Sequence, residues 1–220
     1  NTALGRVALS TDTLGQYSVA VGYAALFAQN QTTAVNTYNV AVGYNAGGAI
    51  TTGVDNVLVG GLTGDALTDA DVNIAIGTSA LSSDTLGSKS IAIGKGALFT
   101  QNFTTATDSH NIAVGVNAGL AVTTGTQNTL LGSLSGDAVT TGIQNVAVGM
   151  NSLGALTDAD YNVAVGAYAL DADTMGSQTT AIGYGALSAQ NFSTATNSLN
   201  TAVGYTAGLS VATGAENTIV

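Results

Sequence analysis

Side chains able to carry out catalysis are few and widely spaced in this chain. His110 is the only histidine, and cysteine is absent. One histidine cannot form a two-histidine metal site, and no second histidine is available for a Ser-His-Asp arrangement. Without cysteine there are no disulfides, thiolate ligands or cysteine nucleophiles. We therefore expect neither zinc chemistry nor nucleophilic catalysis.

Acidic residues are the other possible source of chemistry. Paired aspartates two residues apart share one face of an extended segment, so they could bind Ca²⁺ or act together on a glycosidic bond. EF-hand and glycine-aspartate calcium motifs are missing, however, and the acids recur with the sequence repeat, as solvated turns do. We predict that they supply solubilising charge, that the chain has no catalytic, cofactor-binding or metal site, and that it is not an enzyme. The pairs are Asp69 and Asp71, Asp158 and Asp160, and Asp171 and Asp173.

The composition excludes several classes of partner. Three cations face thirteen acids, which gives a formal charge of −10. Nucleic acids and anionic membrane surfaces require clustered Lys and Arg, so we expect neither as a partner, and no membrane contact by this segment. With 29 Gly and no Pro, the chain suits strands joined by tight turns. No phosphate-binding glycine motif is present.

One short motif repeats along the whole chain. Its form is [Asn/Ser]-[Val/Ile/Thr]-Ala-[Val/Ile]-Gly, the usual spacing is 17 residues, and three spacings are 21. A 17-residue unit cannot bury its own apolar face, whereas identical units stacked in register share a core. The repeat predicts an all-β fold, a parallel β-solenoid of about thirteen turns over 1–220, and the uncapped ends suggest part of a longer fibre. The repeat glycines are Gly5, Gly22, Gly43, Gly60, Gly77, Gly94, Gly115, Gly132, Gly149, Gly166, Gly183 and Gly204, and a further copy begins at Asn217.

Residue sizes around the repeat glycine, taken as position 0, predict which face is inside. Position −2 is Ala in ten of thirteen copies, and position +4 is always Leu or Gly. The large residues at −2, which are Leu58, Leu130 and Ile219, each follow a turn with Gly at +4. This volume compensation predicts that −2 and +4 meet inside a thin coil.

The bulky columns at −3 and −1 should then point outward. A long Val/Ile ridge exceeds the apolar area that a soluble monomer normally exposes, so we expect it to be buried between copies of the chain, with a homotrimer as the simplest arrangement. The alternative is that this face fills a monomeric coil. The predicted oligomer core comprises Val19, Val21, Val40, Val42, Ile74, Ile76, Ile91, Ile93, Val163 and Val165.

Position −4 is Asn in ten of thirteen copies. Stacked Asn side chains can hydrogen-bond between neighbouring turns, so we predict a structural asparagine ladder.

The three longer spacings carry related insertions at about 27–38, 99–110 and 188–199, called insertions 1, 2 and 3. Loops on a rigid scaffold are free to vary, so specificity for a cell-surface glycan or protein is expected there. The alternative is that these loops brace neighbouring chains with their Phe side chains buried. The only three Asn-x-Ser/Thr sequences begin at Asn30, Asn102 and Asn191. The candidate binding residues are Phe27, Gln29, Asn30, Phe99, Gln101, Asn102, Phe103, Gln190, Asn191 and Phe192.

The segments NVAVGYNAG, SIAIGKGAL and NTAVGYTAG resemble the head repeats of trimeric autotransporter adhesins and the related repeats of phage tail fibres. The resemblance implies a left-handed parallel β-roll assembled as an intertwined homotrimer, with a role in surface attachment or receptor binding. We therefore expect a structural or adhesive fibre segment located outside the cell, on a cell surface or a virion appendage. A self-assembling filament with end-to-end stacking is the alternative. An ice-binding solenoid would require Thr in every turn, and the Thr-Thr-Gly sequences are only sporadic.

Overall fold

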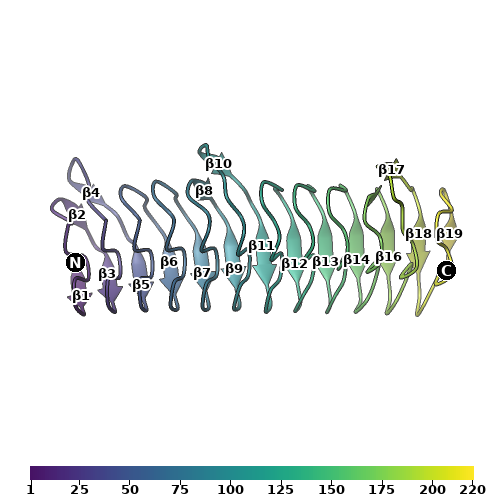
Figure 1. Ribbon diagram of the computed structural model, residues 1–220, viewed down its shortest axis with the longest axis horizontal. Coiled ribbons are helices and arrows are strands. Elements are labelled where there is room, and N and C mark those ends of the chain that lie inside the picture. The colour runs from purple at the N-terminus through teal and green to yellow at the C-terminus, as the bar shows by residue number, and fades with distance from the viewer. The chain divides into compact units, whose positions relative to one another are not determined.

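A computed structural model describes residues 1–220 and contains strands but no helix. The chain forms two compact units, unit 1 (Asn1–His110) and unit 2 (Asn111–Val220), each a stack of similar turns (Figure 1). No helix long and apolar enough to cross a membrane is found.

Unit 1 is built on a ladder of six parallel strands, in the order β1, β3, β5, β6, β7 and β9, and two short parallel pairs, β2 with β4 and β8 with β10. Its strands are β1 (Thr2–Leu4), β2 (Gly15–Gln16), β3 (Val19–Val21), β4 (Val35–Asn36), β5 (Val40–Val42), β6 (Val57–Val59), β7 (Ile74–Ile76), β8 (Gly87–Ser88), β9 (Ile91–Ile93) and β10 (Thr107–Asp108).

Unit 2 repeats this plan with a ladder of seven parallel strands, in the order β11, β12, β13, β14, β16, β18 and β19, and one short pair, β15 with β17. Its strands are β11 (Ile112–Val114), β12 (Thr129–Leu131), β13 (Val146–Val148), β14 (Val163–Val165), β15 (Gly176–Ser177), β16 (Thr180–Ile182), β17 (Thr196–Asn197), β18 (Thr201–Val203) and β19 (Thr218–Ile219). Six and seven turns together confirm the predicted parallel β-solenoid of about thirteen turns.

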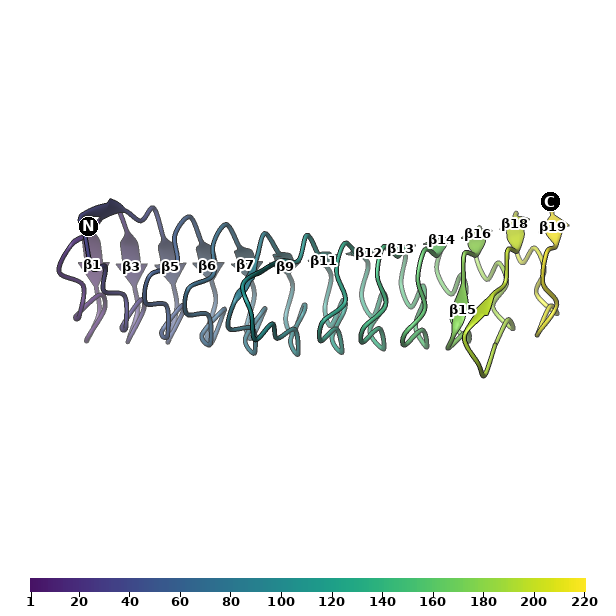
Figure 2. The same cartoon turned by 90° about the horizontal axis from the view of Figure 1, so that it is seen from above.

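The ladder strands pair so that equivalent repeat positions lie side by side. Ala20 pairs with Ala41, for example, although the two are separated by a turn that carries an insertion. Seen from above, the ladder strands lie along one side of each unit, and the return part of each turn lies along the other (Figure 2). The insertions are therefore accommodated outside the ladder and do not shift its register.

The repeat glycine makes the corner at which each ladder strand ends. Gly22 has φ +135°, and a β-carbon there would overlap the carbonyl oxygen of Gly43 in the next turn. Only glycine tolerates both the conformation and this close approach of two backbones. For this reason every complete repeat in the chain has glycine at position 0.

Each turn also adopts the left-handed conformation at positions −5, +2 and +4, where most of the residues are not glycine. In one turn these are Tyr38, Ala24 and Leu26, with φ of 49°, 56° and 48°. Such residues are individually unfavourable by about 1 kcal/mol. Backbone bonds between turns offset this, because the Leu26 amide donates to the Ala46 carbonyl at 3.0 Å.

The interior of the coil is thin and apolar. Apart from Ala3 and Leu9 in the first turn, the Ala side chains at −2 and the Leu side chains at +4, such as Ala41 and Leu26, are fully buried. A β-carbon on Gly64 would lie 2.9 Å from Cδ2 of Leu58, so Leu58 fills the space that Gly64 leaves. The prediction that −2 and +4 meet inside the coil is confirmed.

The asparagine ladder at −4 is also confirmed. Asn73 donates its backbone N–H to Oδ1 of Asn56 at 3.0 Å, and Nδ2 of Asn56 donates to the Ala70 carbonyl of the next turn at 2.8 Å. Both asparagines are fully buried. Each ladder residue therefore satisfies backbone groups that the irregular corner leaves unpaired.

Candidate interaction surfaces

The outward side of the ladder strands is apolar in both units. We call positions −3 and −1 the Val/Ile face. In unit 1, Val42 and Ile76 are 36% and 37% exposed, and in unit 2, Ile182 is 39% exposed. The side chains of all ten predicted oligomer-core residues point out of the coil and are partly exposed in the single chain: Val19, Val21, Val40, Val42, Ile74, Ile76, Ile91, Ile93, Val163 and Val165.

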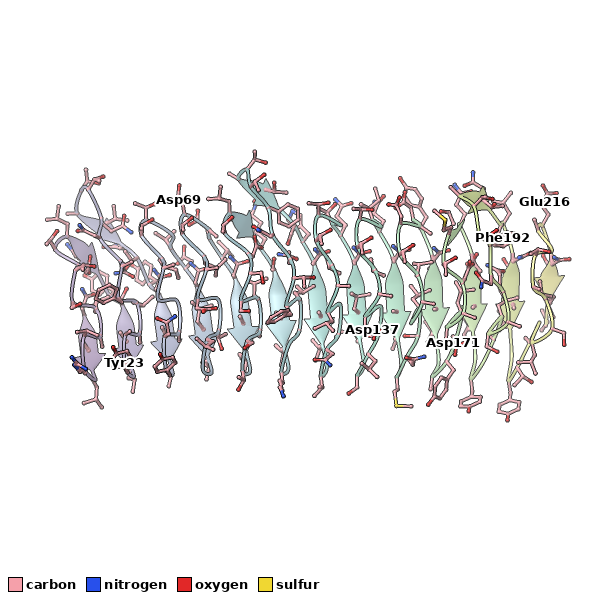
Figure 3. The ribbon with its side chains drawn as sticks, in the orientation of Figure 1. Tyr23, Asp69, Asp137, Asp171, Phe192 and Glu216 are labelled. Atoms are coloured by element: carbon pink, nitrogen blue, oxygen red, sulfur yellow. The ribbon has the colours of Figure 1, made fainter.

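The Val/Ile face carries no charge. All 26 residues at −3 and −1 are Val, Ile, Leu or Thr, although the chain has a net charge of −10. The acids lie in the corners and in the return part of the turn, as Asp69 does at the end of the turn away from the glycine corner (Figure 3). A parallel sheet normally has both faces covered, so the exposed side of this ladder is an unusual surface for an isolated chain.

Stacked tyrosines border this face in unit 1. Tyr17 stacks on Tyr38 and Tyr23 stacks on Tyr44, both with ring centroids 5.5 Å apart. The four rings stand at positions −5 and +1, two residues before and two residues after the Val/Ile face. The guanidinium carbon of Arg6 lies 5.8 Å from the centroid of Tyr23, a cation–π distance. Tyrosine pairs thus lie at both ends of β3 and β5.

Unit 2 has a tyrosine cluster at the glycine corner only. Tyr184 and Tyr205 stack with centroids 5.5 Å apart, and Tyr168 meets the edge of Tyr184 at 5.8 Å. Tyr205 is 78% exposed. Rings with one apolar face and a polar tip are enriched in protein interfaces, which makes these corners interface candidates.

The insertions rest on buried polar groups that replace the apolar core. Position +7 is apolar in regular turns, such as Ile50, but it is Asp84 in the turn before insertion 2 and Gln101 in the turn that carries it. Asp84 accepts hydrogen bonds from the backbone N–H of Gly87 at 3.0 Å and of Phe103 at 3.1 Å, and from Nε2 of Gln101 at 2.6 Å. Both side chains are fully buried. The carboxylate is thereby satisfied within the protein.

Insertion 3 has the same arrangement. Asp173 accepts from the N–H of Gly176 and of Phe192, and Nε2 of Gln190 donates to it at 2.6 Å. Figure 3 places Phe192 at the end of its turn away from the glycine corner. Insertions 2 and 3 are thus each anchored by one buried Asp and one buried Gln.

Insertion 1 is held more loosely. Nε2 of Gln29 lies 3.2 Å from Asp12, and Gln31 occupies the place that Phe has in the other two copies. Both glutamines are buried, whereas Asp12 is partly exposed.

The structure corrects part of the predicted binding surface. Five candidates are buried because they form or cover the polar network, so they present little or no surface to a ligand: Gln29, Gln101, Gln190, Phe103 and Phe192. The other five are exposed, namely Asn30, Asn102, Asn191, Phe27 and Phe99. Of the two alternatives for the loops, burial of the Phe side chains holds for Phe103 and Phe192 but not for Phe27 and Phe99.

A signal for this network was present in the sequence. The exceptions to Asn at −4 are Ser18, Ser90 and Thr179, and each stands in the turn before an insertion. The Ser90 hydroxyl accepts from Gln101 at 2.8 Å and hydrogen-bonds the Ser109 hydroxyl. A break in the asparagine column therefore marks where an insertion is anchored.

The paired aspartates mostly cap neighbouring turns. Asp69 accepts a hydrogen bond from the Thr52 hydroxyl, and Asp71 accepts one from the Val54 N–H at 2.8 Å. Burial raises the pKa of Asp71, and the charges of neighbouring aspartates add to this. No group of three or more His, Cys, Asp or Glu side chains is placed to hold a metal ion, and the surface has no pocket.

Two further aspartates have incomplete hydrogen bonding. Oδ1 of Asp65 and Oδ1 of Asp137 are buried without a partner. Desolvation by burial raises the pKa of both carboxyls and also that of Asp171. These groups carry a desolvation penalty that a carboxylate in water does not.

A threonine column at +8 was missed by the sequence reasoning, which considered only Thr-Thr-Gly. The Thr123 hydroxyl donates to the Thr140 carbonyl at 3.2 Å, and the Thr140 hydroxyl donates to the Thr157 carbonyl at 3.1 Å. These hydroxyl protons are used within the protein. The threonine column therefore forms a second structural ladder, in addition to the asparagine ladder at −4.

Comparison of the chain with protein-family models, with curated proteins and with solved structures gave no match.

Proposed function

We propose that this chain is a structural or adhesive segment of an extracellular or virion fibre, and that it works as a homotrimer packed through the Val/Ile face. The observation that carries the proposal is the uncharged, partly exposed Val/Ile face of a chain whose net charge is −10. Copies with the same charge repel one another, so they associate most readily through a face without charge.

The size of this face favours a stable assembly. Burying the exposed third of a Val or Ile side chain contributes on the order of 1 kcal/mol. Repeated at two positions in every turn, the gain exceeds the several kcal/mol that association requires. Three chains are the simplest set in which this face of every chain is enclosed around an axis.

A fibre role fits the rest of the surface. The turns have no pocket, and their polar groups are mostly bonded to neighbouring turns, as in the asparagine and threonine ladders. Attachment would then use exposed features on the scaffold, such as the insertions and the tyrosine corners. The resemblance to adhesin and tail-fibre repeats supports the same assignment.

Sedimentation velocity tests the assembly. The wild-type chain should sediment as a discrete trimer, and the double variant Val42→Asp/Val165→Asp should not associate. The matched control is Thr124→Asp/Thr213→Asp, because both threonines are exposed at position +9, which is Asp in other turns. A folded wild-type monomer would refute the proposal, and open-ended polymers would favour the filament.

Cross-linking gives a second readout that does not depend on the folding of an Asp variant. The chain lacks cysteine, so Val42→Cys introduces a single reactive site on the Val/Ile face. A short thiol cross-linker should join copies of this variant, and it should leave the control Thr124→Cys as single chains. Equal cross-linking of the two variants would count against the face as an interface.

A further inference from the structure

The three Asn-x-Ser/Thr sequences share one place in the fold. They begin at Asn30, Asn102 and Asn191, all at position +8, where regular turns have the threonine column. No other asparagine of the chain is followed at the second position by Ser or Thr. Each sequence lies within one of the three insertions.

The geometry of these asparagines leaves one side of the amide free. Asn102 is exposed, and its Oδ1 accepts a hydrogen bond from the Thr85 hydroxyl at 3.0 Å. Its Nδ2 makes no hydrogen bond. Thr104, two residues on, is exposed as well.

The other two copies agree. Asn30 accepts from Thr13 at 3.0 Å, and Asn191 accepts from Thr174 at 3.1 Å. Both asparagines are exposed with Nδ2 free, and the hydroxyl residues that follow them, Thr32 and Ser193, are exposed.

The asparagines of the −4 ladder have the opposite arrangement. Asn128 is fully buried, and its Nδ2 donates to the Gly142 carbonyl at 2.8 Å. A substituent on this nitrogen would break the ladder, whereas a substituent on Nδ2 of Asn102 would leave every hydrogen bond in place. The asparagines of the −4 ladder therefore use Nδ2 within the protein, whereas Nδ2 of the three +8 asparagines is free to carry a substituent.

We propose that Asn30, Asn102 and Asn191 are N-glycan acceptors when the chain passes through a secretory pathway that carries out N-glycosylation. The donor is an oligosaccharide on a lipid diphosphate. A bond forms between Nδ2 and the anomeric carbon, and the bond from that carbon to the diphosphate oxygen breaks. The amide loses one proton, and the lipid diphosphate leaves.

The acceptor positions are compatible with the Val/Ile face. Position +8 lies in the return part of the turn, and the inserted segments project at the end of the turn away from the glycine corner, as β10 does in unit 1 and β17 in unit 2 (Figure 1). A glycan there leaves the outward side of the ladder uncovered. The inference is independent of the proposed assembly, since it requires only exposed acceptors.

Translation of the full chain behind a cleavable secretory signal, with endoplasmic-reticulum microsomes, tests the inference without depending on folding yield. Three stepwise gel shifts that endoglycosidase removes are expected. The variants Thr32→Ala, Thr104→Ala and Ser193→Ala should each lose one shift, because each removes the hydroxyl of one acceptor sequence. No shift would overturn the inference, and fewer than three would overturn it for the unmodified sites.

The secreted chain supplies the second measurement. Its intact mass should show three glycans, and its circular dichroism and unfolding temperature should match those of the enzymatically deglycosylated protein. A glycosylated chain that is secreted but unfolded would contradict the claim that a glycan on Nδ2 leaves the turn intact.

Discussion

Leu58 occupies the space that a side chain at Gly47 would need: a β-carbon on Gly47 would lie 2.7 Å from Cδ1 of Leu58. Leu58 stands at −2 relative to Gly60, and Gly47 stands at +4 relative to the preceding repeat glycine, Gly43. Their contact limits the combined volume of the side chains at positions −2 and +4, so that a large residue at one position requires a small one at the other.

Gly47→Ala should therefore destabilise the protein by about 1–3 kcal/mol, the usual effect of overpacking a core. The left-handed conformation adds about 1 kcal/mol of its own, since an alanine at Gly47 would bear the same strain as Leu26 at the equivalent position. Thermal unfolding should show a decrease in midpoint. The control is Gly61→Ala, where a β-carbon would meet nothing within 4 Å.

A double-mutant cycle separates the steric effect from the conformational one. In Gly47→Ala/Leu58→Ala the added methyl group enters space that Leu58 has vacated, so the double variant should be more stable than the sum of the single effects by 1 kcal/mol or so. Strict additivity would show that the two residues do not compete for volume.

The same volume rule explains why so much of the fold was predictable from the sequence. Because each repeat position occurs thirteen times or nearly so, the exchange of Leu and Gly at +4 is visible in the sequence alone. Leu58 and Leu130 were informative because they broke the pattern. Since positions −2 and +4 fill the interior, the alternating Val/Ile positions −3 and −1 must point outward.

The interior of the insertions was not predictable by the same reasoning. The sequence predicts Gln101 and Phe103 on a binding surface, because Gln is usually exposed and a loop is usually solvated. Their burial depends on Asp84, which stands in another turn, 17 residues before Gln101. A network that crosses turns becomes visible only when positions +7 and −4 are considered together.

Asn56→Ala tests the asparagine ladder. The substitution removes the acceptor of the Asn73 N–H and the donor to the Ala70 carbonyl. Two buried backbone groups left unpaired should reduce the free energy of unfolding by about 2–4 kcal/mol. Chemical denaturation measures this. The control Asn36→Ala, at an exposed asparagine, should change stability by less than about 0.5 kcal/mol, and similar effects of the two would contradict a structural ladder.

Asp84→Ala tests the anchoring of insertion 2. It removes the acceptor of the Gly87 and Phe103 amides and of Gln101. Hydrogen exchange of these two amides should become faster by a factor of ten or more, since loss of about 1.4 kcal/mol of local stability gives a tenfold change. Asp158→Ala, at an exposed aspartate, is the control. Unchanged protection in Asp84→Ala would show that the insertion is held by other contacts.

The buried, unpartnered oxygens of Asp65 and Asp137 predict an unusual dependence of stability on pH. Their carboxyl pKa values are raised from the ordinary 3.8 by desolvation, so the folded chain binds these protons more tightly than the unfolded chain. Their favourable contribution is then fully present below pH 3.8 and is lost as the pH rises through the raised folded values. The double variant Asp65→Asn/Asp137→Asn has no such charge to bury. It should unfold at a higher temperature than the wild type at pH 7, and the difference should shrink to near zero as both carboxyls become protonated. Thermal scans of the two proteins between pH 3 and pH 8 measure this, and a difference that stays constant across the range would mean that packing, rather than ionisation, distinguishes them.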